Sequence, residues 1–439
     1  MSLSLSQVNQ WSANLSTMTM FLALQNSVTN NDVRKLVNNW DNYRQTNFYF
    51  NHNLDPEVKI TNQKSSGRCW MFAGLNVMRH YLMREFNLPK DFEFSQSYLF
   101  FYDKLERANF FLNSVIDNRS KPSDDRLLQH LFDDPICDGG QWDMFVNLVK
   151  KYGVVPKTAY AESFHSSSSS RMNWVLTWKL RQYAQEIMSA DKSEEELRKM
   201  KEDFLKEYHR ILALFLGTPP QYFTWAYYDK DNKYHNEGEM SPRDFAKKVN
   251  VDLDDFVCLV DDPRHEYYQR MRVDYLGNVK EGKSVTYYNV PIKELEQNTA
   301  KCINENHPVW FGCDVGKWLH RELDYMDTGL LDYERLLGTN LTMSKRDKLV
   351  YKNSLMTHAM VFSGYEDVDG EVRKWRVENS WDSKGIQSGY YAMSNAWFKE
   401  YVYEVVVHKS VLSDELKNRM SECQEEVVLP PWDPMGSLA

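Results

Sequence analysis

Over residues 62–73 the chain reads Asn62-Gln63-Lys64-Ser65-Ser66-Gly67-Arg68-Cys69-Trp70-Met71-Phe72-Ala73. The Ser-Ser-Gly sequence is typical of a turn, and it delivers one cysteine to the start of an apolar run. Apolar residues then recur with the 3.6-residue period of a helix, at Met71, Leu75, Met78 and Leu82. Other apolar residues flank this face, so we predict a buried helix that ends near Asn87 and Pro89.

A cysteine in the first turn of a helix is a candidate nucleophile. The positive end of the helix dipole and the unpaired N–H groups there favour the thiolate over the thiol. The backbone N–H of Cys69 and the side-chain amide of Gln63 can donate two hydrogen bonds to the oxygen of an attacked carbonyl. The alternative is a cysteine that only packs in the core, the commoner role of a lone intracellular cysteine.

A histidine and an asparagine lie on the two arms of an expected hairpin. Two strand-like segments flank Asp369-Gly370, which is a strong signal for a two-residue turn. The register set by that turn pairs His358 with Trp381. Because side chains alternate along a strand, Asn379 is expected on the same face as both residues. Asn379 can then accept the imidazole N–H and fix its tautomer, while Trp381 shields that bond from water.

These residues resemble the papain superfamily of cysteine peptidases. Gln63, Cys69, His358 and Asn379 match its oxyanion-hole glutamine, nucleophile, general base and orienting asparagine, in the same chain order. Residues 379–381 match its Asn-Ser-Trp signature. The resemblance implies an α+β, papain-like fold of two lobes, one helical and one of antiparallel β-strands. It also implies that an acyl-enzyme forms on the thiol and is then hydrolysed.

A pair of glycines follows Cys137 and Asp138. The segment resembles the loop of this superfamily whose glycines let a substrate backbone approach closely, which would make Gly139 and Gly140 substrate-binding residues. A plain turn before the helix expected over residues 142–152 would also require glycines there. The sequence therefore leaves two interpretations of this pair.

Two departures from the papain pattern indicate which family of the superfamily this chain resembles. Ser66 stands where secreted relatives carry a disulfide cysteine three residues before the nucleophile. The interval from Cys69 to His358 is 289 residues (358 − 69), against about 130 to 150 in papain-type enzymes, so roughly 140 residues are inserted. This long insertion and the proline-rich C-terminus most resemble the bleomycin hydrolase and bacterial aminopeptidase C family. The resemblance covers essentially the whole chain. That family implies a homohexameric barrel with its active sites inside.

We expect five segments along the chain. They are an N-terminal arm (1–55), a helical lobe with the cysteine helix (56–165), inserted helical and hook-like subdomains (166–285), a β lobe with the histidine and asparagine (286–425), and an extended C-terminal arm (426–439). Within the first arm, helices are expected near residues 6–11 and 31–37. The insertion begins at a five-serine stretch, and Ser193 within it is a helix start.

The C-terminal arm carries three prolines, Pro430, Pro431 and Pro434, which remove N–H donors and favour an extended chain. Taken alone, the arm is more simply interpreted as a frayed terminus. The resemblance implies instead that it lies in the active-site cleft. There the carboxylate of Ala439 would pair with the α-ammonium of a substrate, and the arm would exclude chains that continue past it.

Composition limits the function further. The chain has 439 residues, 42% of them hydrophobic, enough for a large core. Its six cysteines lack close pairing and metal-ligand spacing, so reduced thiols in the cytoplasm are expected. The remaining histidines have no cysteine or carboxylate at metal spacing, so we assign no metal and no cofactor. Residues 1–16 lack the pattern of a signal peptide, and no apolar run reaches 18 residues, so neither secretion nor membrane insertion is expected.

Three functions compete. The first is a cytosolic cysteine aminopeptidase that releases N-terminal residues from peptides with a free amino terminus, with bleomycin-hydrolase-like activity. The second is a cysteine endopeptidase or acyl-transfer enzyme of the same fold. The third is a non-catalytic interaction or nucleic-acid-binding assembly. The net charge of −9 and the absence of a dense basic run argue against nucleic acid, and the intact Gln63, Cys69, His358 and Asn379 argue against the third function.

Overall fold

The structure is a computed structural model that describes residues 2–382, 387–423 and 425–439. Its central helix, α4 (Cys69–Phe86), is buried from Cys69 to Met83. The helix ends at Asn87, which adopts the left-handed conformation with φ 50°, and this confirms the predicted stop. Because α4 is apolar on two sides, it packs against helices on one side and against the sheet on the other.

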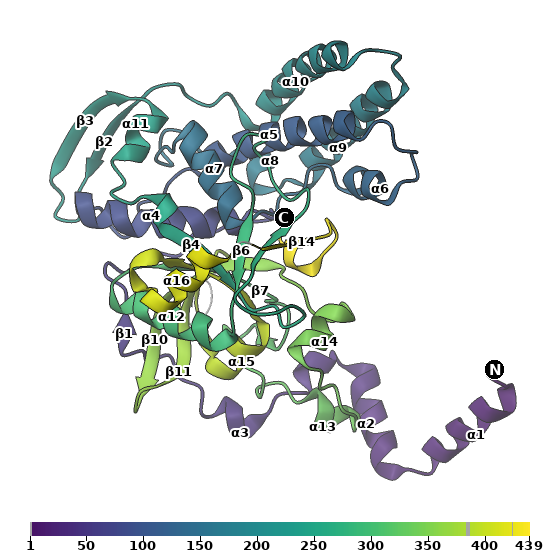
Figure 1. Ribbon diagram of the computed structural model, residues 1–439. Helices are drawn as coiled ribbons and strands as arrows, with labels where there is room; N and C mark the ends of the chain where they lie inside the picture. The colour runs from purple at the N-terminus through teal and green to yellow at the C-terminus, as the bar shows by residue number, and fades with distance from the viewer. Residues whose placement is uncertain (1, 383–386, 424) are drawn as a thin grey trace.

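The helical lobe lies on one side of α4 (Figure 1). It contains α5 (Gln96–Asp117), α6 (Arg126–Asp133) and α7 (Trp142–Tyr152), and α5 and α7 pack against α4. The bounds of α7 agree with the prediction. Trp70, Trp142 and Trp310 are fully buried where this lobe meets the sheet, so one apolar core joins the two lobes.

The insertion adds helices to the outer side of α5 (Figure 1). They are α8 (Phe164–Ser167), α9 (Ser170–Ser189) and α10 (Glu194–Leu216). Ser193 caps α10 in a capping box with Glu196, which confirms the predicted start. Further along the chain, β2 (Phe223–Tyr228) and β3 (Tyr234–Met240) form a separate hairpin beside α11 (Pro242–Lys247).

The sheet of the β lobe has the order β14-β5-β6-β4-β13-β7-β10-β11-β12-β9-β8, with β1 on β10. The strands are β1 (His52–Asn53), β4 (Phe256–Val260), β5 (Arg270–Val273), β6 (Thr286–Asn289), β7 (Val309–Cys313), β8 (Leu319–His320), β9 (Tyr325–Met326), β10 (His358–Val368), β11 (Glu371–Glu378), β12 (Tyr390–Ser394), β13 (Val402–His408) and β14 (Glu426–Leu429). The central pairs are antiparallel, as expected, whereas β14 with β5, β4 with β6 and β12 with β9 are parallel.

The β lobe begins earlier in the chain than predicted. β4 and β5 precede residue 286, yet β4 pairs with β13 in the middle of the sheet. The apolar run of β4 fits such a buried strand, so the boundary at 285 is corrected to one before β4. Helices on this lobe are α12 (Ile292–Asn304), α13 (Tyr333–Leu337), α14 (Lys345–Val350), α15 (Asn395–Tyr401) and α16 (Asp414–Glu422).

The N-terminal arm differs in detail from its prediction. α1 (Leu5–Ser16) covers the first expected helix, but the second is only a 3-10 turn, η1 (Val33–Lys35), capped by Asp32. A further helix, α2 (Thr19–Asn30), lies between them, and α3 (Trp40–Tyr43) follows. α1 and α2 extend away from the body of the molecule, and neither contains a buried residue (Figure 1).

The C-terminal arm returns to the centre of the molecule, where the C-terminus lies between the two lobes (Figure 1). After β14 the chain forms a 3-10 turn, η4 (Pro434–Gly436), so the prediction of a fully extended arm is wrong at these residues. The turn forms because the Asp433 side chain accepts the Met435 N–H. Nowhere in the described part of the chain is a helix both long and apolar enough to cross a membrane.

Candidate active site

Cys69 opens onto a cavity of about 1060 Å³ between the lobes. Its lining includes Gln63, Gly139, His358 and Trp381. Cys69 is the first residue of α4, and the preceding Arg68 makes no side-chain cap to the helix. The N–H groups of the first turn therefore remain at Cys69, where the sequence predicts an oxyanion site.

His358 is the first residue of β10, and its imidazole lies between Asn379 and Trp381. Its Nε2 is 2.9 Å from Asn379 Oδ1, which also accepts the Ser380 N–H at 2.8 Å. Because an amide oxygen only accepts, Nε2 carries the hydrogen and Nδ1 keeps its lone pair. The Trp381 ring centroid lies 4.6 Å from that of His358 and covers it. The imidazole is thereby held in the tautomer that can take a proton.

The hairpin register that joins these residues is confirmed. Val361 pairs with Glu378, as a two-residue turn at Asp369-Gly370 requires. Two irregularities lie between the turn and this pair, but they shift the register in opposite directions and cancel. Asn379 therefore reaches the face that bears His358. The ladder with β11 ends at the pair of Val361 and Glu378, so it does not include the predicted pair of His358 and Trp381. On the other edge of β10, His358 pairs with Cys313 of β7.

Gln63 is fixed at both ends of its side-chain amide. Nε2 donates to the main-chain oxygen of Ser66 at 2.6 Å, and Oε1 accepts from Ser380 Oγ at 2.6 Å. Since a carbonyl oxygen only accepts, the nitrogen must face Ser66. One hydrogen of Nε2 remains for a further acceptor. The Gln63 main-chain N–H also bonds to the Ser380 oxygen at 2.8 Å, which ties this loop to the end of β11.

Burial favours the neutral forms of both Cys69 and His358. It raises the pKa of the Cys69 thiol to about 11 and lowers the pKa of His358 to about 4. Backbone N–H groups lower the thiol pKa, but by less than burial raises it. The expectation of a resting thiolate is therefore wrong for this enclosed state. Transfer of the proton from Cys69 to His358 would create two opposite charges that stabilise each other.

The two glycines have different neighbours. A Cβ at residue 139 would lie 1.9 Å from the Leu438 carbonyl oxygen and 3.2 Å from Ala439 Cα, so a backbone does approach Gly139 closely. That backbone is the chain's own C-terminus. A Cβ at residue 140 would lie 2.4 Å from the Trp70 ring, so Gly140 lets the nucleophile helix pack.

The C-terminal arm is anchored beside the cavity by polar contacts. Arg264 Nη2 lies 2.7 Å from Asp433 Oδ1, and Ser437 Oγ donates to the Met356 oxygen at 2.8 Å. Leu438 is buried and lines the cavity. The arm is therefore a wall of the cleft rather than a frayed end.

Comparison with known proteins agrees with this geometry. Residues 2–436 match the model of the Peptidase C1-like family. The chain belongs to the Peptidase C1-like family. It is 43% identical over 434 residues to bleomycin hydrolase of Rattus norvegicus. It is 41% identical over 421 residues to aminopeptidase C of Listeria innocua. Each alignment covers 95% of this chain and 95% of the relative. The crystal structure of PepW from Lactobacillus rhamnosis HN001 superposes with a TM-score of 0.96, at 39% identity, over 100% of this chain and 99% of that one.

This member of the Peptidase C1-like family has supporting residues that the sequence did not reveal. The carboxylate of Asp138 accepts the Gly67 N–H at 3.1 Å, and its main-chain oxygen accepts Trp70 Nε1 at 2.7 Å. Asp138 thus holds the chain on both sides of Cys69. Ser380 could have been found from its place in the Asn-Ser-Trp signature. Among the described residues, no three histidines, cysteines or carboxylates are grouped to hold a metal ion.

Proposed function

We propose that this protein is a cysteine aminopeptidase that releases N-terminal residues from peptides. The observation that carries the proposal is the C-terminal backbone lying against Gly139 in the cavity that Cys69 and His358 line. A papain-like cleft open at both ends admits the middle of a chain. A cleft closed at one end by a carboxylate-bearing arm admits a chain end with a positive charge.

The proposed reaction uses four residues. Cys69 Sγ attacks the carbonyl carbon as His358 takes the thiol proton at Nδ1, and Asn379 holds the imidazole from the other side. The free Nε2 hydrogen of Gln63 and the Cys69 backbone N–H receive the developing oxyanion. His358 then returns the proton to the leaving amine, which breaks the C–N bond and leaves an acyl-enzyme. Water, deprotonated by His358, hydrolyses the thioester and restores the thiol.

The endopeptidase alternative is not favoured. Relatives at 41% to 43% identity carry the names aminopeptidase C and bleomycin hydrolase. A bleomycin-hydrolase-like activity is therefore part of the proposal. Peptides with a free amino terminus are the proposed substrates, and Ala439 is proposed to bind that terminus. Gly139 is proposed to border the same subsite.

We also propose a cytoplasmic homohexamer that does not bind nucleic acid. All six cysteines are free thiols, which suits a reducing compartment. The arm formed by α1 and α2 has no buried residue, and the hairpin of β2 and β3 in the insertion exposes Tyr228 and Tyr234, so both are available for contacts between subunits. The net charge of −9 opposes phosphate binding.

The test is hydrolysis of one fluorogenic amino-acid amide, with and without an acetyl group on its amine, by wild-type protein and Cys69→Ala. We expect cleavage of the free-amine form alone, and a loss of about 10³-fold or more in Cys69→Ala. Alkylation followed by mass spectrometry should label Cys69 before the other cysteines. An active Cys69→Ala with another cysteine alkylated first would contradict the nucleophile. Cleavage of only the acetylated form would contradict the aminopeptidase.

A further inference from the structure

Arg68 and Glu162 form an ion pair directly behind the nucleophile turn. Nη1 and Nη2 of Arg68 donate to Oε1 and Oε2 of Glu162 at 3.1 and 3.0 Å, in the bidentate geometry of a strong pair. The Arg68 side chain is fully buried, and its guanidinium carbon lies 5.1 Å from the ring centroids of both Phe72 and Phe100. Because an unpaired buried charge is costly, the Glu162 carboxylate stabilises this buried guanidinium.

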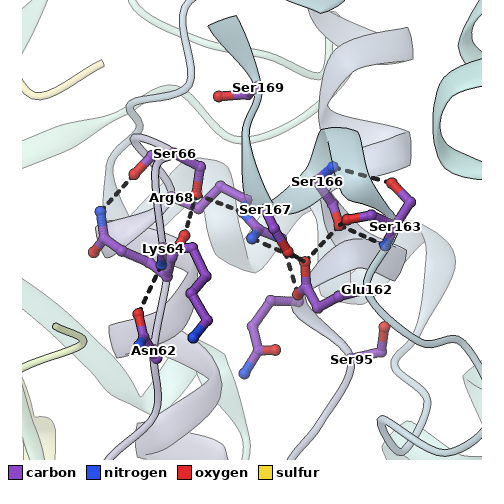
Figure 2. A network of polar contacts seen from close by, with 12 residues as sticks. Asn62, Lys64, Ser66, Arg68, Ser95, Glu162, Ser163, Ser166, Ser167 and Ser169 are labelled. Carbon is purple, nitrogen blue, oxygen red and sulfur yellow. Dashed lines mark hydrogen bonds and ion pairs between the residues drawn. The ribbon is translucent and has the colours of Figure 1, made fainter. Parts of the chain in front are cut away.

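The carboxylate is itself held by the serine run at the start of the insertion. Oε2 of Glu162 accepts from the hydroxyls of Ser166 and Ser167 (Figure 2). Burial raises the pKa of Glu162, but the Arg68 charge and the hydrogen bonds from Arg68 and Ser166 lower it more, so the carboxyl stays ionised with a pKa below its usual value. Both Arg68 and Glu162 are therefore charged, and the hydroxyls of the insertion hold the Glu162 carboxylate in place.

The third nitrogen of Arg68 reaches the loop that carries Gln63. Nε donates to Ser66 Oγ at 2.9 Å (Figure 2). Because the guanidinium only donates, the Ser66 hydroxyl must accept there and send its own hydrogen elsewhere. That hydrogen goes to the Gln63 main-chain oxygen at 2.7 Å. Arg68 therefore sets the direction of the Ser66 hydroxyl and closes the turn from residue 63 to residue 66.

The same turn determines how the Gln63 amide points. Gln63 Nε2 donates to the Ser66 main-chain oxygen at 2.6 Å, so any movement of Ser66 moves the nitrogen that faces the oxyanion. Main-chain contacts join this turn to the insertion as well, because Ser65 N–H donates to the Ser167 oxygen at 2.9 Å. An unbroken series of contacts runs from Glu162 through Arg68 and Ser66 to Gln63.

We propose that Arg68 and Glu162 are positioning residues that hold the Gln63 amide in the orientation needed to stabilise the oxyanion. The proposal rests on the oxyanion role of Gln63 in the proposed function. Neither Arg68 nor Glu162 touches the reacting atoms. Their effect passes through Ser66, and it should appear in amide hydrolysis and not in the intrinsic reactivity of the Cys69 thiol.

The test uses the full chain with Arg68→Met and Glu162→Met combined, which removes both charges without leaving either buried alone. Three quantities are measured: kcat on the free-amine amide, KM, and the rate at which iodoacetamide alkylates Cys69. Alkylation needs the thiol and His358 but forms no oxyanion. We expect kcat to fall by about 10-fold or more, with KM and the alkylation rate unchanged. Unchanged kcat, or equal losses in kcat and alkylation, would overturn the proposal.

Arg68→Lys is a second variant that keeps the charge and loses the three-way contact to Glu162 and Ser66. It should show the same loss of kcat, whereas full kcat in folded Arg68→Lys would overturn the proposal. The matched control is Lys374→Met with Glu366→Met at the far end of β10. That pair has side-chain exposures of 4% and 26%, against 0% and 22% for Arg68 and Glu162. The control variant should leave kcat unchanged. A loss of kcat as large as that of the test variant would overturn the proposal.

Combination with Gln63→Ala separates this proposal from the proposed function. Gln63→Ala alone should lower kcat by about 10²- to 10³-fold, as loss of one oxyanion donor does. Adding Arg68→Met and Glu162→Met should then cost little more, because both changes remove the same interaction. If the kcat losses of Gln63→Ala and of the Arg68→Met and Glu162→Met variant multiplied instead, the positioning role of Arg68 and Glu162 would be overturned. Full activity in Gln63→Ala would instead overturn the oxyanion assignment itself, and with it the basis of this proposal.

Discussion

At the scale of single residues, the proposed mechanism starts from two neutral groups, Cys69 and His358, that exchange one proton. Burial lowers the pKa of His358 to about 4, so the imidazole remains a base well below neutral pH. As pH falls, His358 gains its proton only near its folded-state pKa, and kcat/KM should be lost there. We expect kcat/KM on the free-amine amide to be flat from about pH 7 to about pH 5 and to halve near pH 4.

The control for this profile is far-UV circular dichroism at each pH, which separates protonation of His358 from acid unfolding. An acid limb centred near pH 6.5, with the fold intact, would mean that burial does not lower the pKa of His358.

In the proposed mechanism Asn379 orients His358 without supplying a proton, so the loss of activity on removing Asn379 should be partial. We expect Asn379→Ala to lower kcat by less than the about 10²- to 10⁴-fold that a general base contributes. The reason is that the imidazole still lines the same cavity as Cys69, although it is no longer held in one tautomer. His358→Ala, measured in parallel, sets the scale. An Asn379→Ala variant as inactive as His358→Ala would show that orientation is indispensable.

Sequence reasoning succeeded for residues whose chemistry is local and failed for their supports. Gln63 and Cys69 are six residues apart in one turn, and the hairpin turn fixes which face Asn379 shares with His358. Glu162 is 94 residues from Arg68, and no periodic pattern links a carboxylate to a guanidinium over that interval. The thiol pKa was also mispredicted, because the helix start is visible in a sequence and the burial that opposes it is not.

At the scale of elements, the C-terminal arm and the glycine loop form one wall of the cleft. Gly139→Ala would place a Cβ 1.9 Å from the Leu438 main-chain oxygen, and because no side-chain rotation can relieve a contact between a Cβ and a backbone atom, the arm must move. We expect the ratio of kcat/KM on free-amine to acetylated substrate to fall by about 10-fold or more, the value of one charge-assisted hydrogen bond.

The neighbouring glycine provides the control for Gly139→Ala. A Cβ at Gly140 meets Trp70 of the nucleophile helix and not the C-terminal arm. Gly140→Ala should lower activity on both substrates alike and leave their ratio unchanged. If Gly139→Ala also left the ratio unchanged, the arm would have no selective role at this loop.

Elements were predicted well where one periodic pattern decided them. The bounds of α7 agree with the helix predicted over residues 142–152, since that segment has an apolar face and clear end signals. η4 was missed because its Asp433 cap competes with a proline signal for extended chain. β4 and β5 were assigned to the insertion because their partners, β13 and β14, come more than a hundred residues later.

At the scale of the whole molecule, the arm formed by α1 and α2 is the most exposed part (Figure 1). It carries exposed apolar side chains, among them Leu5, Trp11 and Met20. Apolar surface of this kind is stabilised when another subunit covers it. Light scattering at micromolar concentration should therefore give a mass about six times the 52.0 kDa of one chain. A stable monomer would contradict the proposed hexamer and leave the chemistry of the site unaffected.

The central claim is that a papain-like cleft acts as an aminopeptidase because its own C-terminus closes one end. The most direct test is the ratio of kcat/KM on the free-amine and acetylated amides, measured for the full chain and for a chain lacking Leu438 and Ala439. Ser437 and Asp433 remain to anchor the shortened arm. We predict that truncation lowers the ratio by about 10-fold or more and lets the acetylated substrate be cut. An unchanged ratio in a folded, active truncated protein would contradict the claim.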